Sequence, residues 1–155
     1  MANVKDVAAY ILDKIGPMTA MKLQKLCYYS YGYHLAWEER PLFPERFEAW
    51  ANGPVSPVLY AKHRGRLHLQ AGDIDGNPEA LDEGERESVD LVLSSYGEFT
   101  ASQLSTMTHQ ERPWVCARQR ASVGPMQRST EPLSDADVAE FFEAMIASSV
   151  DGAEG

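Results

Sequence analysis

The segment 18–37 constrains the fold most strongly, because as a helix it has no continuous polar face. Leu23, Leu26 and Cys27 lie on one side of such a helix at spacings of three and four. A second side carries two lysines and three aromatic residues: Lys22, Lys25, Tyr29, Tyr33 and Trp37. A helix that is apolar or aromatic on nearly every side is buried centrally, or is part buried and part interface. Periodicity alone does not decide whether Tyr29, Tyr33 and Trp37 are buried or lie at an interface.

Capping signals predict further helices on both sides of this segment. Asn3 with Asp6 begins a helix that Gly16-Pro17 ends, and Thr19 caps the central helix. The other helix starts are marked by capping residues or by an early proline: Ser56-Pro57, Asp82 with Glu85, Thr100 with Gln103, Pro113 and Ser134. The spacing of Val138, Phe141, Phe142, Met145 and Ile146 along this last helix predicts that all five face inward. The pattern predicts a mainly α protein, a compact single-domain helical bundle of about six helices.

Prolines and aromatic residues interrupt the helical period between residues 41 and 50. Two short extended pieces are predicted there, at Leu42-Phe43 and at Phe47–Trp50, followed by a turn at Asn52-Gly53-Pro54. We therefore expect a small β-hairpin in this region. The segments 66–80 and 121–133 are rich in turn-forming residues and are predicted to be loops.

The chain shows no internal repeat and no linker that would divide it into two domains. The last residues are small and acidic, a composition typical of a frayed terminus. We therefore expect one domain over residues 1–148 and a flexible acidic tail over residues 149–155.

The net charge of −9, from 23 acidic and 14 basic residues, argues against negatively charged partners. Nucleic acids and lipid headgroups are also negative, so long-range attraction to either is disfavoured. No window approaches the roughly 20 apolar residues of a membrane span. The N-terminus lacks the pattern of a signal peptide, and two cysteines require no disulfide framework. These features predict a cytoplasmic protein.

The chemistry-bearing residues do not form a recognisable catalytic or metal-binding pattern. Cys27, Cys116 and the histidines lack the spacing of a zinc site, and no glycine-rich phosphate loop occurs. His109 could act as a catalytic base, with Glu111 as the group that orients its ring. We prefer the interpretation that His109 bonds the C-terminal carbonyl groups of its own helix. The sequence therefore predicts no enzyme, no cofactor and no metal.

A helix-turn-helix DNA reader is the alternative among binding proteins. Residues 4–34 read as helix, tight turn and helix, and the second helix carries Lys22 and Lys25. A DNA reader normally presents more basic residues, and this chain is acidic overall. A DNA-binding regulator thus remains the second hypothesis, with nucleic acid not the expected partner.

Four short sequence motifs, taken in their order along the chain, resemble those of a known family. They are MTAMKLQKLCYYSYGYHLAW (18–37), PLF (41–43), FEAWANGPVSPVLY (47–60) and LSTMTHQERPW (104–114). Their order and spacing are similar to those of the Panacea domain, the SocA-like antitoxin family that also includes phage-associated GepA-type proteins. The similarity extends over roughly residues 4–145.

The resemblance implies the antitoxin of a type II toxin–antitoxin system. Such a protein neutralises, by direct binding, a cognate protein toxin encoded by the neighbouring gene. The mode of neutralisation (steric, allosteric or by delivery to a protease) and the toxin's identity stay open. The family motifs and the aromatic pattern together predict these toxin-binding residues: Lys22, Lys25, Tyr29, Tyr33, Trp37, Trp50, Asn52, Gly53, Pro54, His109 and Trp114. Because the predicted set joins residues of the central helix to the Asn52-Gly53-Pro54 turn, the sequence predicts one shared surface there.

Overall fold

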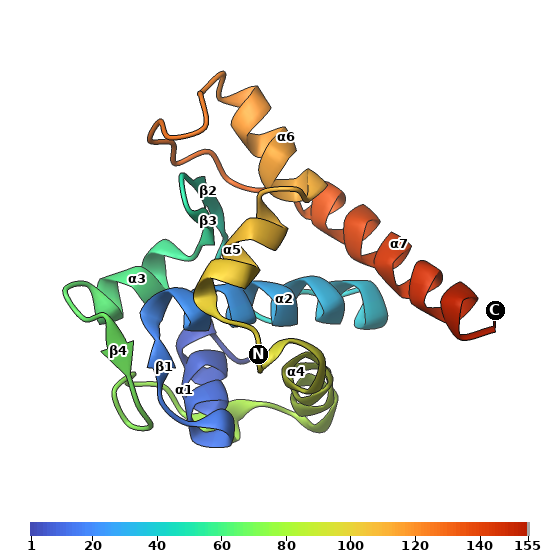
Figure 1. Cartoon of the computed structure of the whole chain (residues 1–155). Coiled ribbons are helices and arrows are strands. Elements are labelled where there is room, and N and C mark those ends of the chain that lie inside the picture. Colours follow the sequence, from blue (N-terminus) through green and yellow to red (C-terminus); the bar gives the residue numbers. More distant parts are fainter. Residues whose placement is uncertain (155) are drawn as a thin grey trace.

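The computed structural model describes the backbone of residues 1–154 and the side chains of residues 1–149 (Figure 1). Within this part of the chain the α-helices are α1 (Val4–Ile15), α2 (Ala20–Glu38), α3 (Pro57–His63), α4 (Glu83–Tyr96), α5 (Ala101–Thr108), α6 (Arg112–Arg120) and α7 (Asp135–Glu154). The short elements are β1 (Met18–Thr19), β2 (Glu48–Trp50), β3 (Gly53–Val55), β4 (His68–Leu69) and the 3-10 helix η1 (Pro78–Ala80). The predicted mainly α fold with a small β-hairpin is confirmed.

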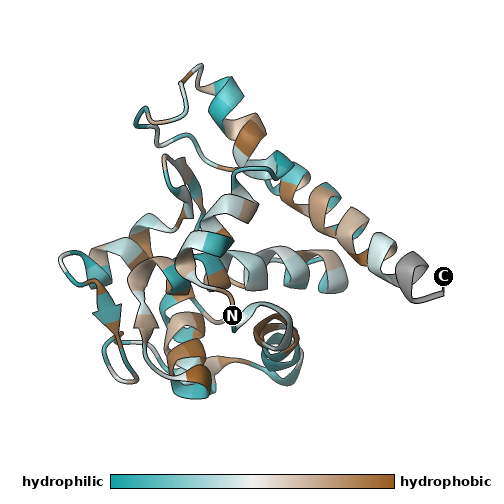
Figure 2. Ribbon diagram, viewed as in Figure 1, coloured by the Kyte–Doolittle hydropathy of each residue, from teal (hydrophilic) through white to brown (hydrophobic). Residues whose placement is uncertain are grey.

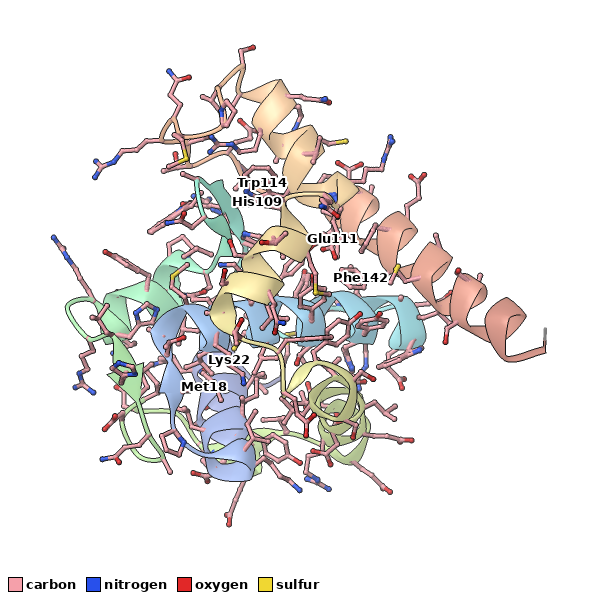
Figure 3. All side chains as sticks on the ribbon, in the orientation of Figure 1. Met18, Lys22, His109, Glu111, Trp114 and Phe142 are labelled. Atoms are coloured by element: carbon pink, nitrogen blue, oxygen red, sulfur yellow. The ribbon has the colours of Figure 1, made fainter. Side chains whose placement is uncertain are left out.

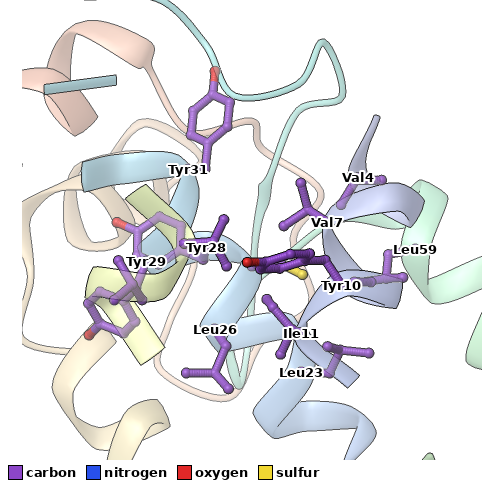
Figure 4. Close-up of a cluster of buried hydrophobic side chains, with 14 of the residues drawn as sticks. Val4, Val7, Tyr10, Ile11, Leu23, Leu26, Tyr28, Tyr29, Tyr31 and Leu59 are labelled. Atoms are coloured by element: carbon purple, nitrogen blue, oxygen red, sulfur yellow. The ribbon is translucent and has the colours of Figure 1, made fainter. Parts of the chain in front are cut away.

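Helix α2 lies at the centre of the fold and packs against α1, α4, α5, α7 and β3 (Figure 1). Every residue from 23 to 32 is buried. Figure 4 shows Tyr10 and Ile11 of α1 facing Leu23 and Leu26 of α2. A helix without a polar face thus becomes the core around which the other helices pack.

An aromatic cluster joins α2 to α4 and α7. The Tyr29 ring stacks on Tyr96 of α4 at a centroid distance of 4.6 Å. Phe142 of α7 meets the rings of Tyr28 and Tyr29 edge-to-face, at 5.7 and 5.9 Å. Tyr28, Tyr29 and Phe142 are fully buried. Such pairs add about 0.5–1.5 kcal/mol each beyond their area burial, so this cluster is a main attachment of α7 to the body.

The predicted helix caps are confirmed. Asn3 with Asp6, Asp82 with Glu85, and Thr100 with Gln103 form complete capping boxes at the starts of α1, α4 and α5. The Thr19 and Ser56 side chains accept backbone hydrogen bonds at the starts of α2 and α3. Ser134 Oγ accepts from the Asp137 amide at 3.3 Å. Each cap contributes about 1 kcal/mol, which explains why local sequence signals located these boundaries well.

The β-hairpin has a different second strand from the one expected. β2 pairs with β3, with Trp50 opposite Gly53, and the loop between them is Ala51-Asn52. Leu42 and Phe43 are not a strand; they are fully buried and fill the core. The turn-like composition Asn-Gly-Pro concealed the strand, because Gly53 adopts a φ of 117° and Pro54 still pairs with Ala49.

The segment 66–80, expected to be a loop, contains β4 and η1. β4 pairs with β1, so that Met18 lies opposite Leu69. None of the described helices has the length and apolar character that a membrane-spanning helix needs.

Helix α7 follows the predicted inward pattern only in its first half. Val138 and Phe142 are buried, whereas Met145 is 38% exposed. The expectation that Met145 faces inward is wrong, because the end of α7 extends away from the body (Figure 1). The predicted domain boundary at residue 148 and flexible tail 149–155 stay predictions, since residue 155 and the side chains of 150–154 lie outside the described residues.

Gly32→Ala tests how α7 attaches to α2. Alanine normally stabilises a helix relative to glycine, but a Cβ at Gly32 would overlap the Phe142 ring. We expect Gly32→Ala to lower the free energy of unfolding by about 1–3 kcal/mol in urea denaturation. Gly84→Ala in α4 is the matched control: its Cβ meets nothing closer than 3.5 Å.

The control should gain up to about 1 kcal/mol. Adding Phe142→Leu to Gly32→Ala should recover part of the loss, since the smaller side chain leaves space for the new methyl group. If Gly32→Ala were as stable as the wild type, the packing of α7 described above would be incorrect.

Candidate partner-binding surfaces

Side chains from α5 and α6 hold the backbone carbonyl groups of the hairpin. From α6, Arg118 Nη1 donates to Ala49 O at 3.0 Å and Trp114 Nε1 donates to Trp50 O at 2.8 Å. From the end of α5, His109 Nε2 bonds Ala51 O at 3.0 Å and Ser105 Oγ donates to Asn52 O at 2.8 Å. Because a carbonyl oxygen only accepts, Nε2 is the protonated nitrogen of His109 in this contact. Figure 3 shows His109 and Trp114 close together beside the hairpin.

Gln24 of α2 holds the end of the hairpin and the start of α3. Its Oε1 accepts from the Ser56 amide at 2.9 Å, and its Nε2 donates to Ser56 O at 3.2 Å. The same Nε2 lies 3.0 Å from Nε2 of His63. Gln24 and Ser56 are both fully buried, so these bonds replace water for both backbone groups.

Lys25 is the next contact along α2, and its side chain is completely buried. Its Nζ donates to Pro54 O at 3.2 Å. Burial lowers the pKa of this amine from 10.5 to about 7. A Cβ at Gly53 would lie 2.6 Å from Lys25 Cε and 2.8 Å from Thr108 Oγ1. Glycine is therefore needed at position 53, both for its positive φ and for the close approach of Lys25.

We call Gln24, Lys25, Ser105, His109, Trp114 and Arg118 the hairpin clamp. Five of these side chains come from three helices and His109 directly follows α5; all six bind carbonyl groups of residues 49–56. Strands of three residues are marginal by themselves. The clamp therefore fixes the position of the hairpin on the helical body.

Glu111 and His109 bind different partners, so the proposed base and its orienting group do not work as a pair. Glu111 Oε2 accepts from Tyr29 Oη at 2.7 Å. Burial raises the pKa of Glu111 to about 7, although the Tyr29 hydrogen bond opposes the shift. The expectation that His109 bonds carbonyl groups of its own helix is also wrong, because its ring reaches Ala51 in the hairpin.

Most of the predicted toxin-binding residues face inward. Five are buried, namely Lys25, Tyr29, Gly53, Pro54 and Trp114. Lys22 donates to Gly97 O at 2.5 Å, and His109 belongs to the clamp. A direct contact between a partner and the buried side chains would require the core to open. In this conformation these residues hold the fold, and their assignment to toxin binding stays a prediction.

Apart from Lys22 and His109, the partly or fully exposed members of the predicted set divide between two surfaces. Trp50 and Asn52 lie on the hairpin, whereas Tyr33 and Trp37 lie at the C-terminal end of α2. The sequence predicted one shared surface of α2 and the turn. The structure separates the two groups, because the hairpin is bonded by Gln24 and Lys25 in the first half of α2, whereas Tyr33 and Trp37 lie near the C-terminal end of that helix.

The first surface, which we call the hairpin face, is a groove beside β2 and β3. Its lining includes Met21, Trp50, Asn52, Tyr60, Arg64 and Arg128. The Trp50 ring meets Tyr60 edge-to-face at 4.9 Å, and its Nε1 donates to Glu48 Oε1 at 2.9 Å. Sequence reasoning missed Arg64 and Arg128 as members; Arg128 comes from the loop 121–133, which gave no local signal.

The second surface, which we call the apolar groove, lies between α2, α4 and α7. Its lining includes Tyr33, Trp37, Leu91, Tyr96, Met145 and Ile146. Sequence reasoning named only the two α2 residues as binding residues. Leu91 had no signal, since it lies on the opposite side of α4 from the buried residues Val89, Val92 and Tyr96.

Helix α2 is not placed as a DNA-reading helix. Its residues 23–32 are buried, and both of its lysines bond backbone carbonyl groups inside the protein. A recognition helix must present side chains to the major groove. The structure therefore offers no support for the helix-turn-helix alternative. Within residues 1–149 no three His, Cys, Asp or Glu side chains come together as a metal site.

Lys25→Met tests the burial of the clamp lysine. The unfolded chain keeps the Lys25 proton up to a pKa of 10.5, whereas the folded protein loses it near pH 7. In between, the unfolded state binds more protons, so raising the pH stabilises the folded wild type relative to the variant. We expect the difference in unfolding free energy, wild type minus variant, to rise by about 2–3 kcal/mol from about pH 6 to about pH 9.

The measurement is urea denaturation at several pH values. Lys62→Met is the matched control, since Lys62 is exposed and pairs with Asp75 at the surface. Its difference from the wild type should change little over the same range. A flat profile for Lys25→Met would contradict the buried position of the amine.

Comparison with known proteins identifies the family. A family model described as "Antitoxin SocA-like, Panacea domain" matches residues 23–115, which run from α2 into α6 and include most of the hairpin clamp. A curated relative, antitoxin SocA of Caulobacter vibrioides (strain NA1000 / CB15N), is 32% identical over 129 residues, covering 72% of this chain and 68% of the relative. No solved structure gives a significant match. The chain therefore belongs to the SocA-like antitoxin family that carries the Panacea domain.

Proposed function

We propose that this protein is the antitoxin of a type II toxin–antitoxin system and acts in the cytoplasm. It neutralises a protein toxin encoded by the neighbouring gene, and it does so by binding that toxin directly through the hairpin face. The observation that carries the proposal is membership of the antitoxin family. The relative is named an antitoxin, and binding by a non-catalytic domain is the simplest way to neutralise a protein.

The hairpin face supports the proposal because it is held rigidly before any partner arrives. The clamp fixes the backbone of residues 49–56 through the bonds described above. A surface ordered in advance loses little conformational entropy on binding. The need for a surface that is rigid before binding also explains why many residues of the family motifs bond the hairpin from the interior of the protein.

The residue types of the hairpin face are those that contribute most to protein–protein affinity. Trp50 and Tyr60 offer large rigid rings that are partly exposed, and Arg64 and Arg128 lie at the same groove. Trp, Tyr and Arg are the residue types enriched at interface hot spots. Met21 adds a flexible apolar side chain that can adapt to a partner.

Asn52→Arg tests this surface. Asn52 is exposed at the tip of the hairpin, and only its backbone carbonyl is used by the clamp. A bulky arginine should obstruct the partner while leaving the fold intact. We expect at least a tenfold loss of toxin affinity, about 1.4 kcal/mol, and loss of growth rescue when the variant is co-expressed with the neighbouring gene product.

Ala71→Arg adds the same charge at another exposed position, in the turn after β4, and serves as the matched control. It should rescue growth and co-purify with the toxin as the wild type does. Thermal melting should be unchanged for both variants. The antitoxin proposal fails if the wild-type protein neither co-purifies with its neighbour nor protects cells from it.

A further inference from the structure

The apolar groove exposes large hydrophobic side chains from three helices. The exposed fractions are 38% for Trp37, 49% for Leu91 and 38% for Met145. Figure 2 shows hydrophobic residues on α7 along the stretch that extends beyond the body. Soluble proteins rarely leave a contiguous apolar groove uncovered unless it receives a partner.

The floor of the groove is aromatic and its polar groups are already satisfied. Tyr33 and Tyr96 share a hydrogen bond between their hydroxyl groups at 2.7 Å. The Tyr33 ring stacks on Trp37 at 5.1 Å and contacts the buried Phe142 at 4.8 Å. A partner therefore meets a firm apolar surface and does not need to supply polar groups to its floor.

Exposed acidic residues occur close to the lining residues along all three helices of the groove: Glu38 follows Trp37, Glu87 lies one helical turn before Leu91, and Glu143 lies two positions before Met145. Glu38 belongs to the end of α2, and its Oε1 would lie 3.8 Å from a Cβ on Gly84 of α4. Glu83 and Glu87 are exposed on α4, and Glu143 is exposed on α7. Among the described residues none of these four carboxylates forms a salt bridge.

The basic side chains nearby are engaged with other groups. Lys14 lies 3.9 Å from Asp90, Arg40 lies 3.2 Å from Asp82, and Arg86 donates to Leu81 O at 2.6 Å. An occupant of the groove therefore meets unpaired negative charge on the helices that flank the apolar floor. The net charge of −9 strengthens this bias at long range.

We propose that the apolar groove binds an amphipathic helix of the toxin, with apolar residues against Trp37, Leu91 and Met145 and basic residues against Glu38 and Glu87. The inference rests on the proposed function and adds the kind of toxin segment that is recognised. Helix-in-groove binding of this type reads apolar residues spaced three and four apart. A second copy of this chain is a poorer occupant, because the acidic flanks of two grooves would face each other.

Designed peptides test the chemistry of the groove without the toxin. The probe is a fluorescein-labelled peptide of about 18 residues with leucines on one helical face and lysines on both flanks. Two controls have the same length: a scrambled sequence, and a sequence with glutamate in place of lysine. We expect fluorescence anisotropy to show at least tenfold tighter binding of the basic amphipathic peptide than of either control.

Leu91→Glu should reduce binding of the basic peptide at least tenfold, because it places a charge on the apolar floor. Ser102→Glu, at an exposed position on α5, adds the same charge elsewhere and should bind as the wild type does. The double variant Glu38→Lys, Glu87→Lys should weaken binding severalfold and reduce its salt dependence. Equal affinity for the basic and acidic peptides, or for wild type and Leu91→Glu, would overturn the inference.

The toxin itself separates this inference from the proposed function. If the wild type and Leu91→Glu bind and neutralise the toxin equally, the groove inference is wrong while the antitoxin function stands. If the basic peptide binds in a Leu91-dependent way but the neighbouring gene product does not bind the wild type, the antitoxin proposal is wrong. A concentration-dependent dimer that Leu91→Glu abolishes would instead assign the groove to a second copy of this chain.

Discussion

The carbonyl groups of residues 49–56 need hydrogen-bond donors, and side chains of α2, α5 and α6 provide them. The bonds to the carbonyls of Ala49, Pro54 and Ser56 are buried, and a buried carbonyl without a partner costs about 1–3 kcal/mol, so leaving these three unpaired would offset much of the stability of a domain of this size. The short hairpin cannot supply these donors from its own strands. The positions of α2, α5 and α6 relative to one another are therefore coupled through one small segment of backbone.

This coupling gives the family motifs a structural role. The lysines on α2, the Asn-Gly-Pro stretch, and the histidine and tryptophan near residue 110 suggest a binding site when only the sequence is considered. In the fold Gln24 and Lys25 meet Ser56 and Pro54, while His109 and Trp114 meet the hairpin from the other side. The motifs therefore contain most of the residues of the hairpin clamp. The surfaces left for partners are the hairpin face and the apolar groove.

Local signals were sufficient for the helices and their caps. Asn3, Thr19, Asp82 and Thr100 were located because capping involves residues only two or three apart. The central position of α2 followed from its lack of a polar face. The strand at 53–55 was missed, since Gly53 and Pro54 have the composition of a turn and become a strand only through pairing with β2.

The site was less predictable, because its bonds join residues far apart in the chain. Arg118 binds Ala49 across 69 positions and Ser105 binds Asn52 across 53, and neither bond leaves a periodic pattern. Lys25 looked like a surface residue, since lysine is almost never fully buried. Tyr29 could not be assigned either, because every side of α2 is apolar or aromatic and periodicity does not identify the outward face.

Native-state hydrogen exchange in a Gln24→Leu variant tests the clamp most directly. Leucine keeps the bulk of Gln24 but removes the acceptor for the Ser56 amide and the donor for its carbonyl. The account predicts that amides of residues 49–56 lose protection by tenfold or more, about 1.4 kcal/mol of local stability, while those of α1 and α4 keep it. Unchanged protection of the hairpin, or an equal loss in every helix, would contradict the claim that the clamp holds this segment.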